Sequence, residues 1–320
     1  MNGLFSKKYD ELFCQENGFS AANQDLSVFF YDYEYNFVNC DNDHRLITAG
    51  YGMNNTPHIM TALQLVRMIN LQKAGYHTQI VLGDYDVLLA RGFSESERIA
   101  EIYMNFAISL GYDVNKGIIR TQTQATDVAA NVVYLSSKVQ DDDFEYVKED
   151  LCDYYHRNER HISMDFPTKV SIMLMMSDFI SPLLMGQYEN VVVASGIDES
   201  KYAVLANLLT QRLEIQGSVG GIFTKVVKGL NNHPKMSKSK PDSGIFLSDD
   251  YQTIARKINT ATNYSKECIQ CQLALILNSS YSADKIEEAF QTKDLKTINR
   301  INCETIDNVY NLAVIWQKQL

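Results

Sequence analysis

Two periods of apolar residues alternate along the chain between residues 46 and 250. Short apolar runs without helical spacing predict buried strands at 46–50, 77–83, 116–122 and 189–196. Between them, apolar residues recur every three or four positions, which predicts helices at 57–73, 94–111, 170–186 and 200–213. Strand, helix and strand in succession form a βαβ unit, whose crossover makes the paired strands parallel.

The first of these helices has a start signal and a stop signal in the sequence. Thr56 followed by Pro57 predicts an N-cap and a first helical residue. Ile59, Leu63 and Val66 then recur at helical spacing until Ala74-Gly75, which predicts the end of the helix.

Beyond residue 250 the strand pattern stops. The segments YQTIARKI, QCQLALIL, ADKIEEAF and ETIDNVYNLAVIW all have helical spacing. We therefore expect an α/β fold, with a Rossmann-like doubly wound parallel sheet over 46–250 and a smaller all-helical domain over 251–320. Residues 1–45 are aromatic and Asn-rich without a clear period, and we expect an N-terminal extension packed on the body.

Composition fits a globular chain outside the membrane. The 320 residues are 45% hydrophobic, which is enough for a sizeable core, and no apolar run reaches the ~20 residues needed to cross a bilayer. The start of the chain does not resemble a signal peptide. Six scattered cysteines indicate free thiols and a cytoplasmic location. Cys268 and Cys271 have metal-ligand spacing, but no second pair completes a site, so we predict buried helical thiols and no metal.

The net charge of −10 excludes a generally basic nucleic-acid coat. A local basic strip is still compatible with it, because attraction to phosphate depends on where Lys and Arg lie. Much of the negative charge falls in an insert at 141–165, which we interpret as a solvated loop or helix face.

Two predicted strand ends have turns suited to a ligand, because ligands of such sheets bind outside the carboxyl ends of the strands. In AGYGMNNTPHIMT (49–61), Gly50, Gly52 and His58 precede or start a helix, whose free N–H groups suit an anion. In SGIDES (195–200), Gly196 permits close backbone approach and Asp198 can accept from ribose hydroxyls. Each turn alone also fits an ordinary turn or helix cap.

A third candidate is the basic, polar run NNHPKMSKSKPDSGIFLSDD (231–250). Its lysines can reach over a triphosphate and stabilise the charge that builds on departing pyrophosphate. On composition alone a solvated surface loop is the favoured interpretation.

The KMSKS run resembles the lysine loop of class I aminoacyl-tRNA synthetases, and KMSKSKPDSGIFLSDD is similar to the tryptophanyl form. GYDVNKGIIRT (111–121), ASGIDESKY (194–202) and SPLLMGQY (181–188) also resemble segments of that family. The resemblance covers roughly residues 46–320. It implies ATP and Mg²⁺, an amino acid, tRNA as a partner, a homodimer, and no membrane association.

The resemblance also implies roles for single residues. His58, Lys235 and Lys238 are the expected catalytic residues, which steady the phosphates. The expected ATP-binding residues are Gly50, Gly52, Met60, Thr61, Gly196, Asp198, Met236, Ser237, Ser239 and Lys240.

Two departures from the family stand near the nucleotide. Met60 replaces the glycine of the HIGH motif, and its thioether is expected either to displace the adenine or to pack against it. Lys240 stands where the family usually has Asp, which adds positive charge toward phosphate or tRNA.

The amino-acid pocket departs further. The family's polar ligands of tryptophan or tyrosine correspond here to Ile47 or Thr48, Leu82, Met185 and Glu199, with Tyr188 beside them. Such a pocket is not expected to select tryptophan or tyrosine strongly. Asp84, Asp86 and Glu199 remain as acidic candidates, although caps and turns explain them equally well.

Three functions follow: an amino acid activated with ATP and transferred to tRNA; the same adenylation chemistry acting outside translation on another acceptor or a non-standard amino acid; or a synthetase-like binding protein without activity.

Overall fold

The computed structural model describes residues 31, 33–37, 41–53, 56–147, 164–233, 235–236, 241–260 and 264–320. Its centre is a six-stranded sheet of order β1-β6-β5-β2-β3-β4. The strands are β1 (Tyr33–Tyr35), β2 (Arg45–Gly52), β3 (His77–Gly83), β4 (Gly117–Thr121), β5 (Asn190–Gly196) and β6 (Ser218–Thr224). All neighbours are parallel except β1, which pairs antiparallel with β6.

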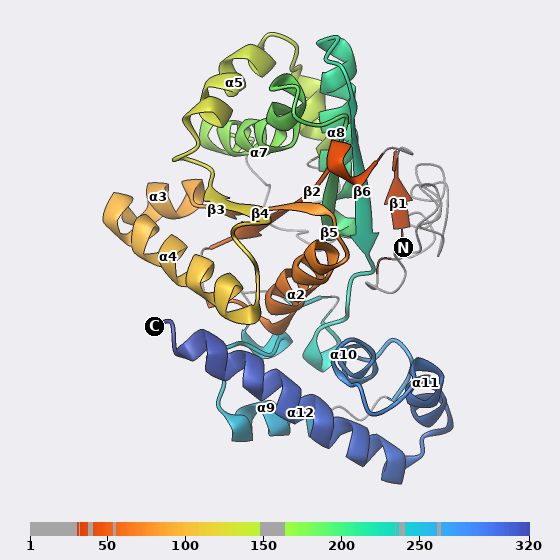
Figure 1. The fold of residues 1–320 in the computed structure, drawn as a ribbon. Coiled ribbons are helices and arrows are strands. Elements are labelled where there is room, and N and C mark those ends of the chain that lie inside the picture. The colour runs from red at the N-terminus through yellow and green to blue at the C-terminus, as the bar shows by residue number, and fades with distance from the viewer. Residues whose placement is uncertain are drawn as a thin grey trace. The chain divides into compact units, whose positions relative to one another are not determined.

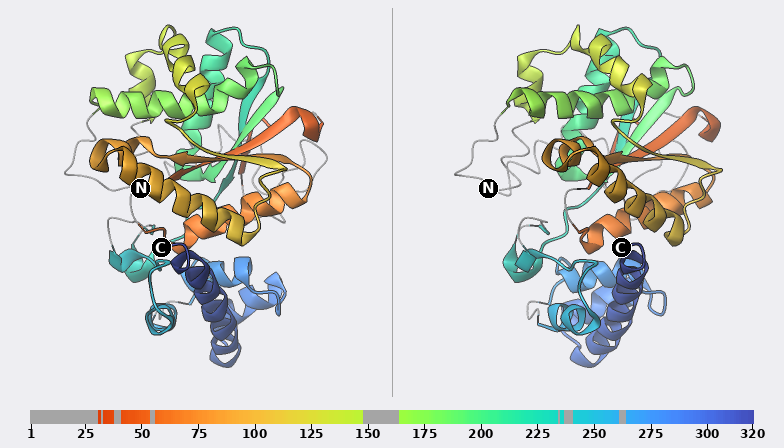
Figure 2. Two further views of the ribbon diagram at one scale, coloured as in Figure 1. Left: turned by 60° about the vertical axis from the view of Figure 1, so that its left-hand side comes forward. Right: turned by 90° about the vertical axis from the view of Figure 1, so that its left-hand side faces the viewer.

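Helices cover both faces of this sheet (Figures 1 and 2). One face is covered by α2 and α4, and the other by α5, α7 and α8. The helices of this part are α2 (Ile59–Lys73), α3 (Tyr85–Arg91), α4 (Phe93–Leu110), α5 (Thr126–Ser136), α7 (Phe166–Leu184) and α8 (Ser200–Arg212). The sheet extends from β2 to β3 and β4 on one side and to β5 and β6 on the other, so the predicted doubly wound α/β fold is confirmed.

The strand predictions are confirmed within two residues. The run 77–83 is β3 itself, and 46–50, 116–122 and 189–196 correspond to β2, β4 and β5. Buried apolar residues, many of them β-branched, fill β2, β3 and β5, as expected for a sheet covered on both faces, whereas Ile118 of the edge strand β4 is exposed.

Two strands are absent from the prediction. In β6, Gly220 and Gly221 weaken the strand pattern, because glycine has low strand propensity. The sheet needs glycine at 220, since an added Cβ would lie 2.4 Å from the carbonyl oxygen of Asn36 in the chain after β1. β1 itself has only three residues and lies in the stretch predicted as an extension. Part of that extension is therefore the edge of the sheet.

The predicted start of α2 is wrong by two residues. The helix begins at Ile59 rather than Pro57. The reason is tertiary: Leu247 N donates to Pro57 O, and Ile59 N donates to Ile245 O, so this backbone is extended and paired before the helix begins. The end is as predicted, with Gly75 at φ 95°.

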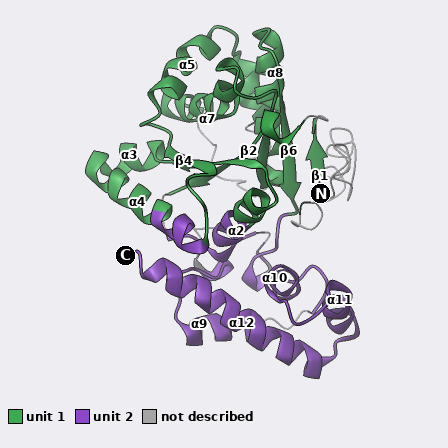
Figure 3. Ribbon diagram, viewed as in Figure 1, with its two compact units in different colours: residues 1–53, 67–104, 111–225 green, residues 54–66, 105–110, 226–320 purple. Residues whose placement is uncertain are grey.

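The chain divides into two compact units (Figure 3). The first comprises 1–53, 67–104 and 111–225 and holds the sheet; the second comprises 54–66, 105–110 and 226–320. Helices of the second unit are α9 (Tyr251–Asn259), α10 (Ile269–Leu277), α11 (Ala283–Thr292) and α12 (Leu295–Gln317). The predicted helical nature of the C-terminal region is confirmed, while the predicted domain bounds stay predictions.

A small apolar core joins three of these helices. Cys271 of α10 packs in a buried cluster with residues of α11 and α12, among them Phe290 and Ile301. Burial raises the pKa of the Cys271 thiol to about 12, so it stays protonated at neutral pH. Cys268 lies just before α10 and is half-buried.

The structure also bears on the acidic insert and on the expected absence of a membrane span. In the acidic insert, residues 141–147 are helical, and 148–163 lie outside the described residues. Within the described part of the chain, every helix is too short or too polar to span a membrane.

The first prediction concerns Glu34 in β1. Its side chain is buried, its Oε2 has no hydrogen-bond partner among the described residues, and burial raises its pKa to about 7. A raised carboxyl pKa means that folding favours the protonated form, so stability is full below about pH 4.5 and is lost as the pH rises through 7. Glu34→Gln is expected to stabilise the protein at pH 8 by on the order of 2–3 kcal/mol and to flatten stability between pH 4.5 and 7.

Urea unfolding from pH 4.5 to 8 measures this effect. Glu101→Gln, at an exposed position of α4, is the control and should leave the pH profile unchanged. A Glu34→Gln profile identical to the wild type would show that the carboxyl is ionised and solvated.

Candidate functional site

The carboxyl ends of the parallel strands provide open backbone positions. Gly50 and Gly52 are exposed at the end of β2, and no atom lies within 4 Å of a Cβ added at either. At the end of β5, the carboxylate of Asp198 folds back over Gly196, where an added Cβ would lie 2.4 Å from its Oδ1. The predicted glycines of both turns therefore lie at the edge where ligands of this fold bind.

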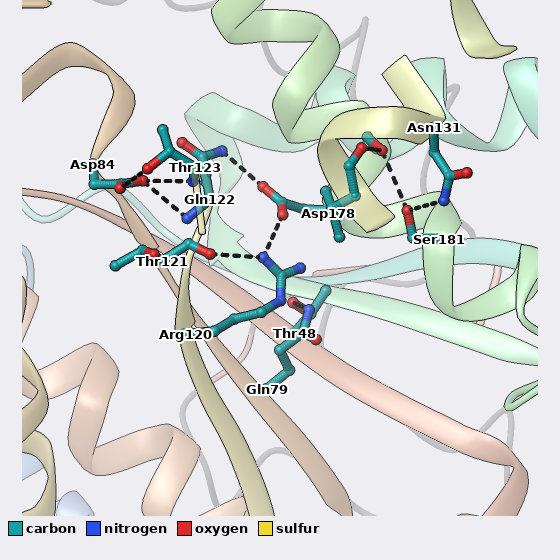
Figure 4. Close-up of polar contacts among 12 residues, drawn as sticks. Thr48, Gln79, Asp84, Arg120, Thr121, Gln122, Thr123, Asn131, Asp178 and Ser181 are labelled. Atoms are coloured by element: carbon teal, nitrogen blue, oxygen red, sulfur yellow. Dashed lines mark hydrogen bonds and ion pairs between the residues drawn. The ribbon is translucent and has the colours of Figure 1, made fainter. Parts of the chain in front are cut away.

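A buried charge pair lies on the sheet face that α7 covers (Figure 4). Nη1 of Arg120, near the carboxyl end of β4, lies 2.8 Å from Oδ1 of Asp178 in the middle of α7. The other carboxylate oxygen of Asp178 accepts from Nε2 of Gln122 at 2.7 Å. Burial raises the pKa of Asp178, whose side chain is 2% exposed, and the Arg120 charge opposes that rise. A buried carboxylate is tolerated here because both oxygens are paired.

Thr48 lies on the same face of the sheet as Arg120. Thr48 pairs with Gln79 in the parallel register, Gln79 pairs with Ile118, and Arg120 is two positions further along β4. Gln79 Nε2 donates to Thr48 Oγ1 at 3.1 Å. Thr48 therefore belongs to the polar lining of this face, as predicted for the amino-acid pocket, although its binding role stays a prediction.

Asp84 ties together the chain ends that follow β3 and β4. Its Oδ1 accepts from the backbone N–H groups of Gln122 at 2.9 Å and Thr123 at 3.0 Å, and its Oδ2 accepts from the Thr123 hydroxyl. These contacts give Asp84 a structural role in holding the turn that carries Gln122.

A second set of hydrogen bonds fastens α5 to α7. Ser177 Oγ donates to Val128 O at 2.6 Å, and Asn131 Nδ2 donates to Ser181 Oγ at 2.9 Å. They hold α7, and with it Asp178, in one position above the sheet (Figure 4).

Met185 and Tyr188 are placed wrongly by the sequence. Both precede β5, so they lie at the amino edge of the parallel strands, opposite to the edge where ligands bind. The Tyr188 ring packs edge-on against His77, the first residue of β3, with centroids 5.9 Å apart. A segment that enters a strand is carried to the edge where the strand begins, which sequence similarity alone does not reveal.

The other predicted pocket residues are not brought together. Leu82 is buried, but its side chain alternates to the face opposite Thr48, because Leu82 is three positions beyond Gln79. Asp86 is exposed in the first turn of α3, and Glu199 is exposed at the end of a short 3₁₀ helix.

In the second unit, residues 57–59 pair with residues 245–247, which lie far away in the sequence. His58 forms an antiparallel bridge with Phe246. Ile59 N donates to Ile245 O at 2.8 Å, and Leu247 N donates to Pro57 O at 3.0 Å. The half-buried His58, Met60 and Thr61 at the start of α2 are thus anchored to the segment that follows the lysine loop.

The two stems of the lysine loop pack on one another. His233 Nε2 lies 3.0 Å from Asp242 Oδ2, and a Cβ added at Gly229 would lie 2.7 Å from the carbonyl oxygens of Lys235 and Ser243. Lys235 is half-buried and Met236 is buried beside Gly244. The predicted Ser237, Lys238, Ser239 and Lys240 lie outside the described residues.

The segment after the loop is braced by one buried turn. Asp249 Oδ2 accepts from Phe246 N at 2.8 Å and from Lys257 Nζ at 2.6 Å. Lys257 also donates to Gly244 O at 2.9 Å. These bonds fix the strand-like backbone that pairs with the start of α2.

Sequence reasoning missed the residues of the charge pair. Arg120 is inside the predicted strand 116–122, and Asp178 interrupts an otherwise apolar helix. That interruption was a usable signal, because an ionisable residue on a buried helix must find a partner.

Comparison with known families gives a match that covers most of the chain. Residues 51–312 match the family described as tRNA synthetases class I (W and Y). The chain belongs to this family. The match includes the start of α2, the lysine loop and most of the helical unit.

Relatives and solved structures agree with the family. The tryptophan–tRNA ligase of Methanocaldococcus jannaschii is 24% identical over 62% of this chain and 53% of its own length. The tyrosine–tRNA ligase of Picrophilus torridus is 24% identical over 68% of this chain and 67% of its own length. The tryptophanyl-tRNA synthetase of Encephalitozoon cuniculi, solved with tryptophan, has a TM-score of 0.76 at 14% identity over 98% of this chain and 93% of that chain. The matched stretch thus spans about half to two thirds of these curated relatives, and the solved synthetase shares the fold.

The second prediction tests the structural role of Asp84. Asp84→Ala leaves the backbone N–H of Thr123 without its acceptor and leaves the Gln122 N–H with only its bond to Leu82 O at 3.1 Å, and should lower the free energy of unfolding by about 1–3 kcal/mol. Asp86→Ala, two residues on and exposed, should change it by less than about 0.5 kcal/mol. Chemical denaturation measures both; equal values for the two variants would contradict the role given to Asp84.

Proposed function

We propose that this protein activates an amino acid with ATP as an aminoacyl-adenylate and transfers the acyl group to tRNA. The observation that carries the proposal is the antiparallel pairing of residues 57–59 with 245–247. It joins the His58 segment and the lysine loop, two motifs about 180 positions apart, in one unit of the fold. Family membership supports the same activity.

Each group has one task in this chemistry. We assign His58 and Lys235, together with Lys238, to the phosphates, and the turn of Gly196 and Asp198 to the ribose. The carboxylate of the amino acid attacks the α-phosphorus and pyrophosphate leaves, so no side-chain nucleophile is required. The ammonium and imidazole groups act by stabilising charge on the departing pyrophosphate.

ATP would bring Mg²⁺ with it, because Mg²⁺ is commonly held by substrate phosphates and few protein ligands. Among the described residues, no three His, Cys, Asp or Glu side chains gather as a metal site. Those residues are compatible with a metal carried on the nucleotide, whose charge would shield the triphosphate.

A second candidate keeps the adenylation and changes the acceptor. The pairing of Asp178 with Arg120, and Met60 in place of glycine, favour a site with altered specificity. Adenylate formation without acylation of any host tRNA would identify this candidate. Scattered thiols support a cytoplasmic location for either one.

The third prediction is amino-acid-dependent exchange of labelled pyrophosphate into ATP. His58→Ala and Lys235→Ala should each lower the exchange rate by about 10²–10³-fold, since each removes a group that stabilises transition-state charge. Lys228→Ala, at an exposed position upstream of the loop, should leave the rate unchanged. A folded wild-type protein without exchange for any of the twenty amino acids would refute the proposed activity.

The fourth prediction is a homodimer. The most exposed large apolar side chains of the described residues include Phe93 and Val133, at 73% and 75% exposure. Together with the outer edge of β4, which pairs with no further strand among the described residues, they favour association with a second copy. Light scattering at micromolar concentration should give twice the 36.4 kDa mass of one chain. A monomeric mass at that concentration, with Phe93→Lys and Val133→Lys giving the same value, would count against it.

A further inference from the structure

The Arg120 side chain is fixed near the carboxyl edge of the sheet. It lies one residue before the end of β4, on the face that α7 covers, and it is 19% exposed. The ion pair with Asp178 prevents the guanidinium from turning out to solvent. Arg120 is therefore held in place and still accessible to a small molecule.

Unused hydrogen-bonding groups remain on Arg120 rather than on Asp178. Oδ1 of Asp178 is in the ion pair with Arg120, and Oδ2 accepts a hydrogen bond from Gln122. A guanidinium has five N–H donors. Nη1 contacts Asp178 and, at 3.2 Å, the carbonyl oxygen of Thr121, whereas Nε and Nη2 have no acceptor among the described residues.

Three N–H donors therefore remain in a partly desolvated position, on the sheet face that Thr48 and Gln79 also line (Figure 4). Gln79 donates to Thr48, and no hydrogen bond joins either side chain to Arg120 among the described residues. These donors are not among the fully buried unpartnered atoms, so water can reach them and a ligand that presents an oxygen can take its place.

We propose that Arg120 determines the amino acid used, by binding a side chain that ends in a hydrogen-bond-accepting oxygen and by excluding indole. This inference rests on the proposed function. Phenol, amide and carboxylate oxygens all accept hydrogen bonds, whereas the indole N–H only donates and would face the donors of the guanidinium. A site built to bond one polar group rejects substrates that lack its complement by large factors.

The test compares tryptophan, tyrosine, glutamine and glutamate in pyrophosphate exchange. The wild type should show a kcat/KM for at least one oxygen-bearing amino acid that is at least about 10²-fold above tryptophan. Among the three, the rates distinguish phenol, amide and carboxylate.

The variant Arg120→Met/Asp178→Asn removes both charges, so that no buried charge is left unpaired. It should reduce the preference over tryptophan by at least about tenfold. Arg120→Lys keeps the charge beside Asp178 but loses the planar fork, and should reduce the preference to a smaller extent. This variant answers the question if the double variant does not fold.

The control is a second Arg–Asp pair of the same unit. Arg212 Nη1 lies 2.6 Å from Asp143 Oδ2, at side-chain exposures of 27% and 6%. Arg212→Met/Asp143→Asn should leave the preference unchanged. Tryptophan as the best substrate of the wild type, or a preference unaltered in the Arg120 variants, would overturn the inference alone. Absence of exchange with all twenty amino acids would instead contradict the proposed function and, with it, this inference.

Discussion

Parallel pairing of β2 on both of its sides is the constraint on which the rest of the first unit depends. β2 pairs with β3 from Leu46 to Gly52 and with β5 from Arg45 to Thr48. Parallel strands bring their carboxyl ends to one edge, and the turns at Gly52, Gly83 and Gly196 therefore share that edge. The same geometry carries Arg120 toward it, because β4 continues the parallel order beyond β3.

The free-energy cost of burying a charge determines which hydrogen-bonding groups are available at that edge. Asp178 interrupts the apolar face of α7, and burial would drive its carboxyl toward the neutral form unless a partner compensated. Arg120 and Gln122 supply the compensation, and Asp84 holds the turn from which Gln122 reaches α7. The result is a rigid guanidinium with unused donors.

In the second unit, backbone and side-chain contacts position a polar loop. Backbone hydrogen bonds between 57–59 and 245–247 anchor one stem beside the start of α2, and Asp249 with Lys257 stiffens the turn that follows. Met236 is buried beside Gly244, so the first lysine of the loop has a fixed neighbour. Contacts of the described residues on both sides of the loop therefore hold its two stems in place.

Local pattern alone determined the layout of this protein. Short apolar runs predict the strands and apolar spacing of three to four residues predicts the helices, and β3 and the end of α2 at Gly75 follow from these patterns. The lysine loop follows from its basic, polar residues. Contacts between distant residues decided the rest. The glycines of β6 are needed for the approach of the chain after β1, the backbone before α2 is extended because it pairs with Ile245 and Leu247, and Tyr188 lies at the wrong edge for a pocket. Periodicity reports which side of an element is buried, but not which residue it meets. The partner of Asp178, and hence the chemistry of the site, exists only once β4 and α7 are packed together.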